Sequence, residues 1–233
     1  MNEGATVAQQ SPESMIETNI PNPGLLRIDA DGDVILVLKG RSKAPADSAS
    51  ETAALSTSET QGSFLVSGKV LTLASPVFRK MFGPNFAEGA RKRKFSCPEI
   101  ILHDDDPTAM RFMLQALHFQ EPEGLDDMDP AKLSNVAIHC DKYDAVRPLQ
   151  PMLSAKLNQI RARAFVKDYG HMLLSASLLR LPKFFSELSI VCQQTMTESG
   201  VLDWENTEVL NIIPATRGIM LPILPPYCLF NEY

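Results

Sequence analysis

Hydrophobic positions change their spacing within residues 64–88, and the rest of the chain is organised around this stretch. Phe64-Leu65-Val66 has the composition of a short strand. The next apolar positions are spaced as on one face of a helix, and they are Val70, Leu71 and Ala74. The pattern therefore predicts a strand that leads into a short helix.

A second short helix is predicted to follow the first at once. Ser75 is a good N-cap residue, and Pro76 suits the first helical position. Apolar side chains recur at helical spacing after it, at Val77, Phe78, Met81 and Phe82. Gly83-Pro84 ends this helix. We expect Phe78 and Met81 to be buried.

Three further runs have strand character. Leu25 to Ile28 can begin a strand, and Asp31-Gly32-Asp33 reads as a turn. Val34 to Leu38 is an uninterrupted apolar run, which indicates a strand buried on both faces. Phe95 to Leu102 is predicted to be another strand.

Helices are predicted for most of the chain after residue 106. Asp106-Pro107 and Asp129-Pro130 both combine an N-cap residue with proline at the first position. A further helix is expected at about 148–164, with Pro151 in its first turn. Residues 173–196 read as one or two amphipathic helices broken near Pro182.

Taken together, these motifs resemble the BTB/POZ domain. The family signature has a phenylalanine, a histidine, a Val-Leu pair, a serine, an aromatic residue and a Met-Phe pair at set spacings. The matching residues here are Phe64, Ser67 in place of the histidine, Val70, Leu71, Ser75, Phe78, Met81 and Phe82. Asp33 matches the "Asp-Val" start of a family strand, and the segment from Asp141 through Tyr143 to Asp144 resembles the "DKYD" of fungal members.

The resemblance implies an α+β fold, in which a small and mostly buried sheet is flanked by short helices. It covers residues 25–164. Within it, residues 39–63 form a Ser/Thr/Ala-rich insertion where the family has a short hairpin connection. We expect residues 1–24 to be a disordered tail, residues 165–200 to be a helical extension, and residues 201–233 to be a proline-containing tail.

Composition narrows the classes of function. The formal net charge of -6 argues against a general nucleic-acid-binding surface. We see no secretory signal, and the longest apolar stretch, 212–230, is broken by an arginine and four prolines, so no membrane span is expected. The 4 cysteines lie far apart and form no zinc motif. These features favour a reduced intracellular protein, cytoplasmic or nuclear.

Several residues have both a chemical and a structural interpretation. Asp104-Asp105-Asp106 could bind a metal, but Asp106 as an N-cap explains the cluster better. His139-Cys140 could be catalytic, but a buried cysteine beside a surface histidine is favoured. Arg91 to Lys94 could be a nuclear-import patch, but a solvated loop between a helix and a strand is the favoured interpretation. No hydrolase, nucleotide-binding or metalloprotease motif is present, so we predict no enzyme and no cofactor.

The resemblance also implies the kind of partner. BTB domains self-associate and recruit other proteins, and some members bind the cullin scaffold of a ubiquitin ligase. Leu25, Leu26 and the exposed face of the 70–74 helix would supply the dimer contact. Phe86-Ala87-Glu88 matches the family's cullin motif of a hydrophobic residue, any residue and Glu, unless Phe86 packs inward and Glu88 is merely solvated. The alternative function is a transcriptional or scaffold regulator that acts through another DNA-binding protein.

Overall fold

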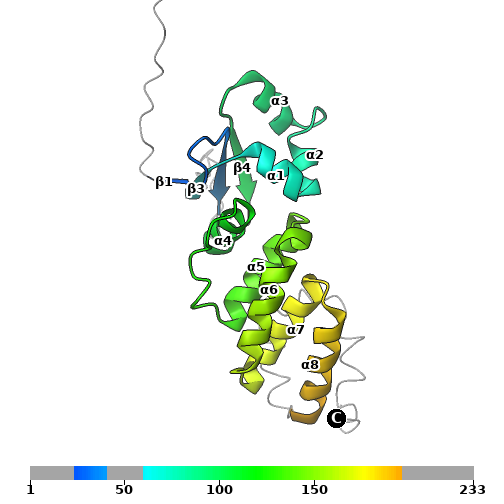
Figure 1. Ribbon diagram of the computed structural model, residues 1–233. Coiled ribbons are helices and arrows are strands. Elements are labelled where there is room, and N and C mark those ends of the chain that lie inside the picture. Colours follow the sequence, from blue (N-terminus) through cyan, green and yellow to red (C-terminus); the bar gives the residue numbers. More distant parts are fainter. Residues whose placement is uncertain (1–23, 41–59, 196–233) are drawn as a thin grey trace, which may run out of the picture.

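The fold is α+β, with a four-stranded mixed sheet and a larger set of helices (Figure 1). A computed structural model describes residues 24–40 and 60–195. The strands are β1 (Leu25–Arg27), β2 (Val34–Lys39), β3 (Thr60–Val66) and β4 (Glu99–His103). They lie in the order β1-β3-β2-β4. Apart from Gly24, the tails predicted for residues 1–24 and 201–233 lie outside the described residues, as do residues 196–200 of the predicted extension and residues 41–59 of the predicted insertion.

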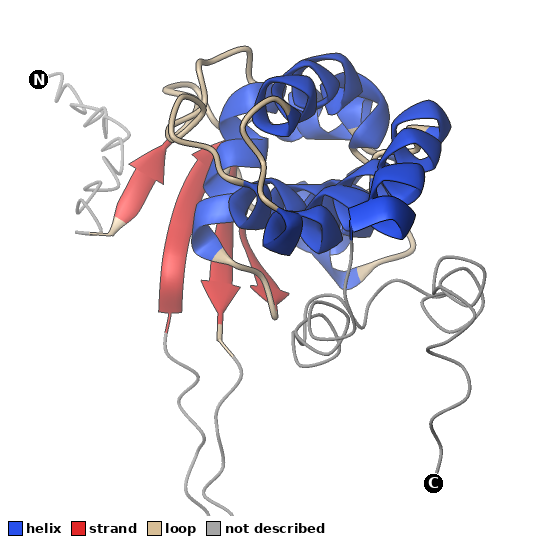
Figure 2. Ribbon diagram, turned by 90° about the horizontal axis from the view of Figure 1, so that it is seen from below, coloured by secondary structure: helices blue, strands red, loops and turns tan. Residues whose placement is uncertain are grey.

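The sheet is built on an antiparallel hairpin of β2 and β3, in which Leu36 is paired with Phe64. At one side β1 runs parallel to β3, and at the other β4 runs parallel to β2. A parallel neighbour requires a crossover, and the helices between β3 and β4 provide it. The described helices lie on one side of the sheet, as Figure 2 shows.

Two strand boundaries differ from those predicted. The insertion was placed at 39–63, but Lys39 belongs to β2 and residues 60–63 belong to β3. Their polar side chains do not prevent pairing, because a ladder uses backbone groups. The strand expected at 95–102 begins only at Glu99, because the N–H of Phe95 closes the preceding helix on the carbonyl of Arg91 at 2.9 Å.

The helices before β4 are α1 (Gly68–Ala74), α2 (Pro76–Met81) and α3 (Ala87–Lys94). After β4 come α4 (Pro107–Leu117), α5 (Pro130–Lys142), α6 (Val146–Arg161), the 3-10 turn η1 (Val166–Asp168), α7 (Tyr169–Leu178) and α8 (Pro182–Thr195). None of these described helices has the length and apolar character needed to cross a bilayer. The expected break near Pro182 is confirmed by the separation of α7 from α8.

Ser75 joins α1 to α2. It is both the C-cap of α1 and the N-cap of α2, where its Oγ accepts the N–H of Phe78 at 3.0 Å. The same hydroxyl donates to the carbonyl of Tyr143 at 2.5 Å. One buried serine therefore sets the bend of the helix pair and ties it to the end of α5, and the predicted N-cap is confirmed.

The two Asp-Pro starts are also confirmed. Asp106 caps α4 by accepting the N–H of Ala109 at 2.8 Å, and Asp129 caps α5 by accepting the N–H of Lys132 at 2.8 Å. By contrast α6 begins at Val146 rather than Pro148. Pro151 is therefore in the second turn of α6, and its predicted place in the first turn is wrong.

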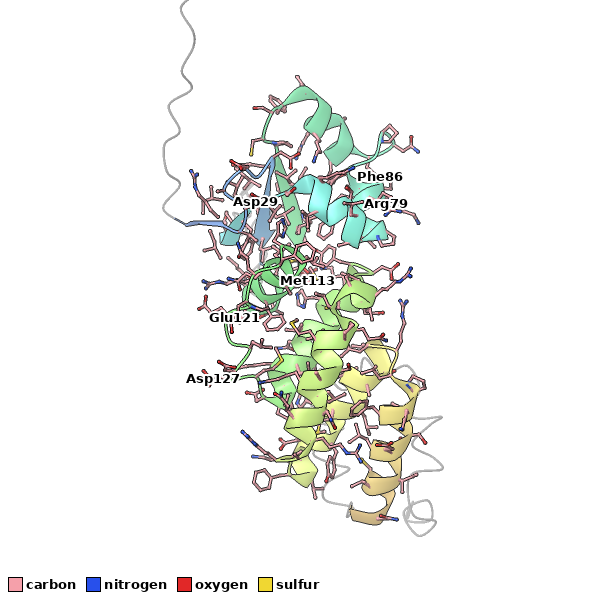
Figure 3. All side chains as sticks on the ribbon, in the orientation of Figure 1. Asp29, Arg79, Phe86, Met113, Glu121 and Asp127 are labelled. Atoms are coloured by element: carbon pink, nitrogen blue, oxygen red, sulfur yellow. The ribbon has the colours of Figure 1, made fainter. Side chains whose placement is uncertain are left out.

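One hydrophobic core runs from the sheet through α4 and α5 to α7 and α8. Figure 3 shows Met113 of α4 between the sheet and the lower helices. Phe78 is fully buried, as predicted, and its ring stacks on Tyr143 with centroids 4.7 Å apart. Met81 is only half-buried at the edge of the core, so the expectation of full burial is wrong for this residue.

The other residues of the family signature divide between core and rim. Phe64, Leu71 and Tyr143 are buried. Val70 and Phe82 are half-buried, and Asp33 is a partly exposed polar residue at the start of β2. The strand Val34–Leu38 is largely buried, as its apolar run indicates.

Candidate functional site

The candidate site is the end of the molecule formed by α1, α2 and α3, where the predicted docking residues lie. Figure 3 shows Phe86 and Arg79 there, with Arg79 on α2. Two of these helices are held together by a side chain, because Arg79 Nε donates to the carbonyl of Thr72 at 2.9 Å.

Phe86 is exposed. It is the N-cap residue of α3, in extended backbone conformation, and 51% of its surface is accessible to solvent. Its side chain gives no capping hydrogen bond. The interpretation in which Phe86 packs inward is therefore wrong, and the aromatic ring is presented at the turn between α2 and α3.

Glu88 lies in the first turn of α3, where a negative charge is favourable to the helix dipole. Its carboxylate has no hydrogen-bond or ion-pair partner among the described residues and is half-buried. An acceptor that is positioned by a helix but not yet paired can still bind a donor from a partner.

Gly89 lies inside α3 and is buried. A Cβ placed there would overlap the carbonyl oxygen of Gly83. Glycine is needed because the helix crosses the backbone of the preceding turn at contact distance. This close approach fixes the position of Phe86 and Glu88 relative to α2.

The basic run 91–94 was predicted to be a loop, and that prediction is wrong because it forms the second half of α3. Lys92 points inward. Its Nζ lies 2.8 Å from Asp33 Oδ2 and 5.1 Å from the centroid of the Phe82 ring. Arg91 and Lys94 are exposed. Lys92 therefore anchors α3 to the sheet and to α2.

Asp33 links this anchor to α1. Its Oδ1 accepts the N–H of Gly68 at 2.6 Å, and its Oδ2 pairs with Lys92. Partial burial raises the pKa of the Asp33 carboxyl, but the hydrogen bonds from Lys92 and Gly68 outweigh it and leave the pKa below its usual value of 3.8. The predicted motif residue is thus the junction between the sheet, α1 and α3.

Ser67 stands where the family signature has a histidine, and a histidine from another element, His118 at the end of α4, contacts it. His118 Nε2 accepts the N–H of Ser67 at 3.0 Å, and its Nδ1 donates to the carbonyl of Leu114 at 2.8 Å. The Ser67 hydroxyl caps α1 through the N–H of Val70 at 3.4 Å. No local pattern predicts this contact, because 51 positions separate the two residues.

The acidic run 104–106 serves the fold. Asp106 is the N-cap of α4, while the side chain of Asp105 is buried. Asp105 accepts the hydroxyl of Tyr143 at 2.7 Å and pairs with Lys142 Nζ at 2.7 Å. Burial, together with the Asp105 carboxylate, raises the pKa of Tyr143 well above its usual value of 10. The run therefore joins α4 to the end of α5.

His139 is buried, so the prediction of a surface histidine is wrong. Its Nδ1 donates to the carbonyl of Asn135 at 2.8 Å, and its Nε2 accepts the N–H of Asp106 at 3.0 Å. Cys140 is buried as predicted, and burial raises the pKa of its thiol to about 12. A thiol with this pKa is protonated at neutral pH and is a poor nucleophile.

One serine–histidine pair was missed by the sequence reasoning. Ser134 Oγ lies 2.9 Å from His171 Nδ1, across α5 and α7. Ser134 is fully buried and its hydroxyl also donates to the carbonyl of Ala131 at 2.8 Å. The hydroxyl is closed off from solvent, so this pair joins two helices rather than presenting a nucleophile.

Exposed apolar side chains also mark surfaces that the sequence did not single out. Leu73 on α1 is 67% exposed, and Phe95 at the end of α3 is 54% exposed. Among the described residues, no group of three or more His, Cys, Asp or Glu side chains is arranged to hold a metal ion. Neither a scan against models of protein families nor a search of curated proteins finds a match for this chain.

Proposed function

We propose that this protein is a non-enzymatic interaction module of the BTB/POZ type, which self-associates and recruits protein partners. Its docking site for a cullin scaffold consists of Phe86 and Glu88. The observation that carries the proposal is an exposed aromatic ring two residues before a carboxylate that has no partner among the described residues, on a helix held in place by its neighbours.

The anchoring of α3 supports a binding role for Phe86. An exposed aromatic ring contributes strongly to binding when it is presented in a fixed position, because little conformational entropy is then lost. Lys92 and Gly89 fix the helix, while the ring itself makes no capping contact. Stability and binding are thus divided between different residues of the same helix.

The order of elements is also consistent with the proposal. An antiparallel hairpin is followed by three short helices, a parallel strand next to the first hairpin strand, and three longer helices. Apart from α3, which is additional to the expected helix pair, this agrees with the order that the resemblance in residues 25–164 implies. On α1, Leu73 offers an apolar contact for self-association.

Calorimetry of the purified full chain with the N-terminal region of the cognate cullin tests the docking site. We expect Phe86→Ala to weaken binding by on the order of 2 kcal/mol, a loss typical of an interface anchor. Phe95→Ala is the matched control, because it removes an equally exposed phenylalanine from the other end of the same helix. It should leave the affinity unchanged.

Glu88→Ala should cost less than Phe86→Ala, because a hydrogen bond at the rim of an interface contributes less than a buried aromatic ring. None of the three variants should lower the melting temperature by more than a few degrees, since the side chains are exposed or half-buried. If the wild type does not bind when the partner is present at about 50 μM, a concentration at which a micromolar dissociation constant would give clear binding, the cullin partner is rejected.

A further inference from the structure

The strand β4 lies at an edge of the sheet. Two hydrogen bonds show which of its backbone groups face β2 and which point outward. Ile35 N–H donates to the carbonyl of Pro98 at 3.0 Å, and Asp104 N–H donates to the carbonyl of Lys39 at 3.4 Å. In a parallel ladder, alternate residues bond to the same neighbour. Ile100 and Leu102 therefore face β2, while the backbone groups of Glu99, Ile101 and His103 point away from the sheet.

Within residues 24–40 and 60–195, those outward groups are nearly all unpaired. Among the described residues only the carbonyl of His103 has a partner, Lys142 Nζ at 2.8 Å. The N–H and C=O of Ile101 have none, and 37% of this residue is exposed. A row of unpaired donors and acceptors beside an apolar side chain is a template for another strand.

β4 has few of the usual protections of an edge strand, which here are the charged side chain of Glu99 and the contact of Lys142 with the His103 carbonyl. Its five residues, EIILH, include no proline, glycine or lysine, and its register with β2 is unbroken. The opposite edge of the sheet is different, because β1 has only three residues. Of the two edges, β4 is therefore the one suited to pairing with a further strand.

The sequence of β4 fits a second copy of itself. If two β4 strands run antiparallel with Ile101 opposite Ile101, Glu99 of each copy lies opposite His103 of the other. Glu99, Ile101 and His103 are the exposed residues of the alternating pattern, so these side chains lie on one face. The imidazole can donate a hydrogen bond to the carboxylate, and the two isoleucines pack together across the strands.

We infer that two copies of this chain associate through antiparallel pairing of β4 about Ile101. The contact joins two four-stranded sheets into one continuous sheet. It buries only five residues of each strand, so it is a weak contact that forms at high local concentration. It uses a different surface from Leu73 and Phe86, and it does not depend on the proposed docking function.

Sedimentation of the full chain over about 10–500 μM, a range suited to small interfaces, tests the inference. The mass of the wild type should rise with concentration. Ile101→Lys should raise the dissociation constant of this association at least tenfold, because it places a charge at the centre of the pairing. Leu73→Glu adds a charge on α1 instead. It should leave unchanged the dissociation constant of the association that Ile101→Lys weakens.

Charge exchange provides a second test that does not alter Ile101. His103→Glu alone should weaken association, since it sets the Glu99 carboxylate of one copy opposite a second carboxylate on the other. Combining it with Glu99→Lys should restore association through pairs of opposite charge. A wild type that stays monomeric over the whole range, association unaffected by Ile101→Lys, or a double variant that fails to recover would each overturn the inference.

Discussion

Truncation of Phe78 to alanine tests whether the helix pair belongs to the core. The ring is fully buried, stacks on Tyr143 with an interplanar angle of 3°, and lies 5.7 Å from the ring of Phe82. Removing it leaves a cavity that the neighbours cannot fill, because Tyr143 is held by its hydroxyl bond to Asp105. Substitutions of this kind cost about 3–5 kcal/mol of unfolding free energy.

The loss is large beside the roughly 5–15 kcal/mol total stability of a domain. With a urea dependence of about 1–3 kcal/mol per molar, the midpoint of unfolding should fall by at least about 1 M. Leu73→Ala is the control on the adjacent helix. Its side chain is exposed, so its unfolding free energy should change by less than about 0.5 kcal/mol. Equal midpoints for Phe78→Ala and the wild type would refute the placement of α2 in the core.

Three further predictions follow from single residues. Gly89→Ala should displace α3 and weaken cullin binding while Phe86 remains intact, as calorimetry would show; unchanged binding would contradict the close approach to Gly83. Phe119→Gly should raise the unfolding free energy in urea by about 0.5–1 kcal/mol, because Phe119 has φ 59° where helix ends favour glycine; a loss of stability would contradict this. Burial holds the pKa of His171 below its usual 6.5, despite opposing effects of Asp129 and Asp168, so its contribution to stability is complete above pH 6.5 and is lost as the pH falls below that value. Urea unfolding of His171→Gln should show a smaller loss on acidification than the wild type, and an equal loss would contradict this.

Local chemistry in the sequence was sufficient to place most helices. Asp106, Asp129 and Ser75 mark their helix starts through hydrogen bonds that span only three residues, so a short window contains the whole signal. The uninterrupted apolar run of β2 likewise was sufficient to predict that this strand is buried. In each case the residues that cause the structure are neighbours in the chain.

The helix α3 could not be predicted in this way. Its sequence, AEGARKRK, has no apolar stripe, and it is held by Lys92 pairing with Asp33 and by Gly89 meeting Gly83. The exposure of Phe86 depends on the same contacts. The candidate docking motif was therefore found by resemblance, but its presentation on a helix was visible only in three dimensions.

Helix ends were a second difficulty. Glycine commonly closes a helix, yet α4, α5 and α7 end in the same two-bond pattern with Phe119, Asp144 and Arg180 in the left-handed position. Arg180 Nη2 lies 3.2 Å from Asp144 Oδ1, so two of these closing residues pair with each other. Such a contact between α5 and α7 has no signature in either segment alone. The burial of His139 was missed for the same reason, since its partner at Asp106 is 33 positions away.

Amide hydrogen exchange, measured with and without the N-terminal region of the cognate cullin, tests the proposed docking function most directly. The account predicts that exchange slows at residues 86–90 when the partner is added, because Phe86 and Glu88 become covered. Amides of α8, at the other end of the molecule in Figure 1, should exchange at the same rate in both samples. Unchanged exchange at residues 86–90 in the presence of saturating partner would contradict the proposal.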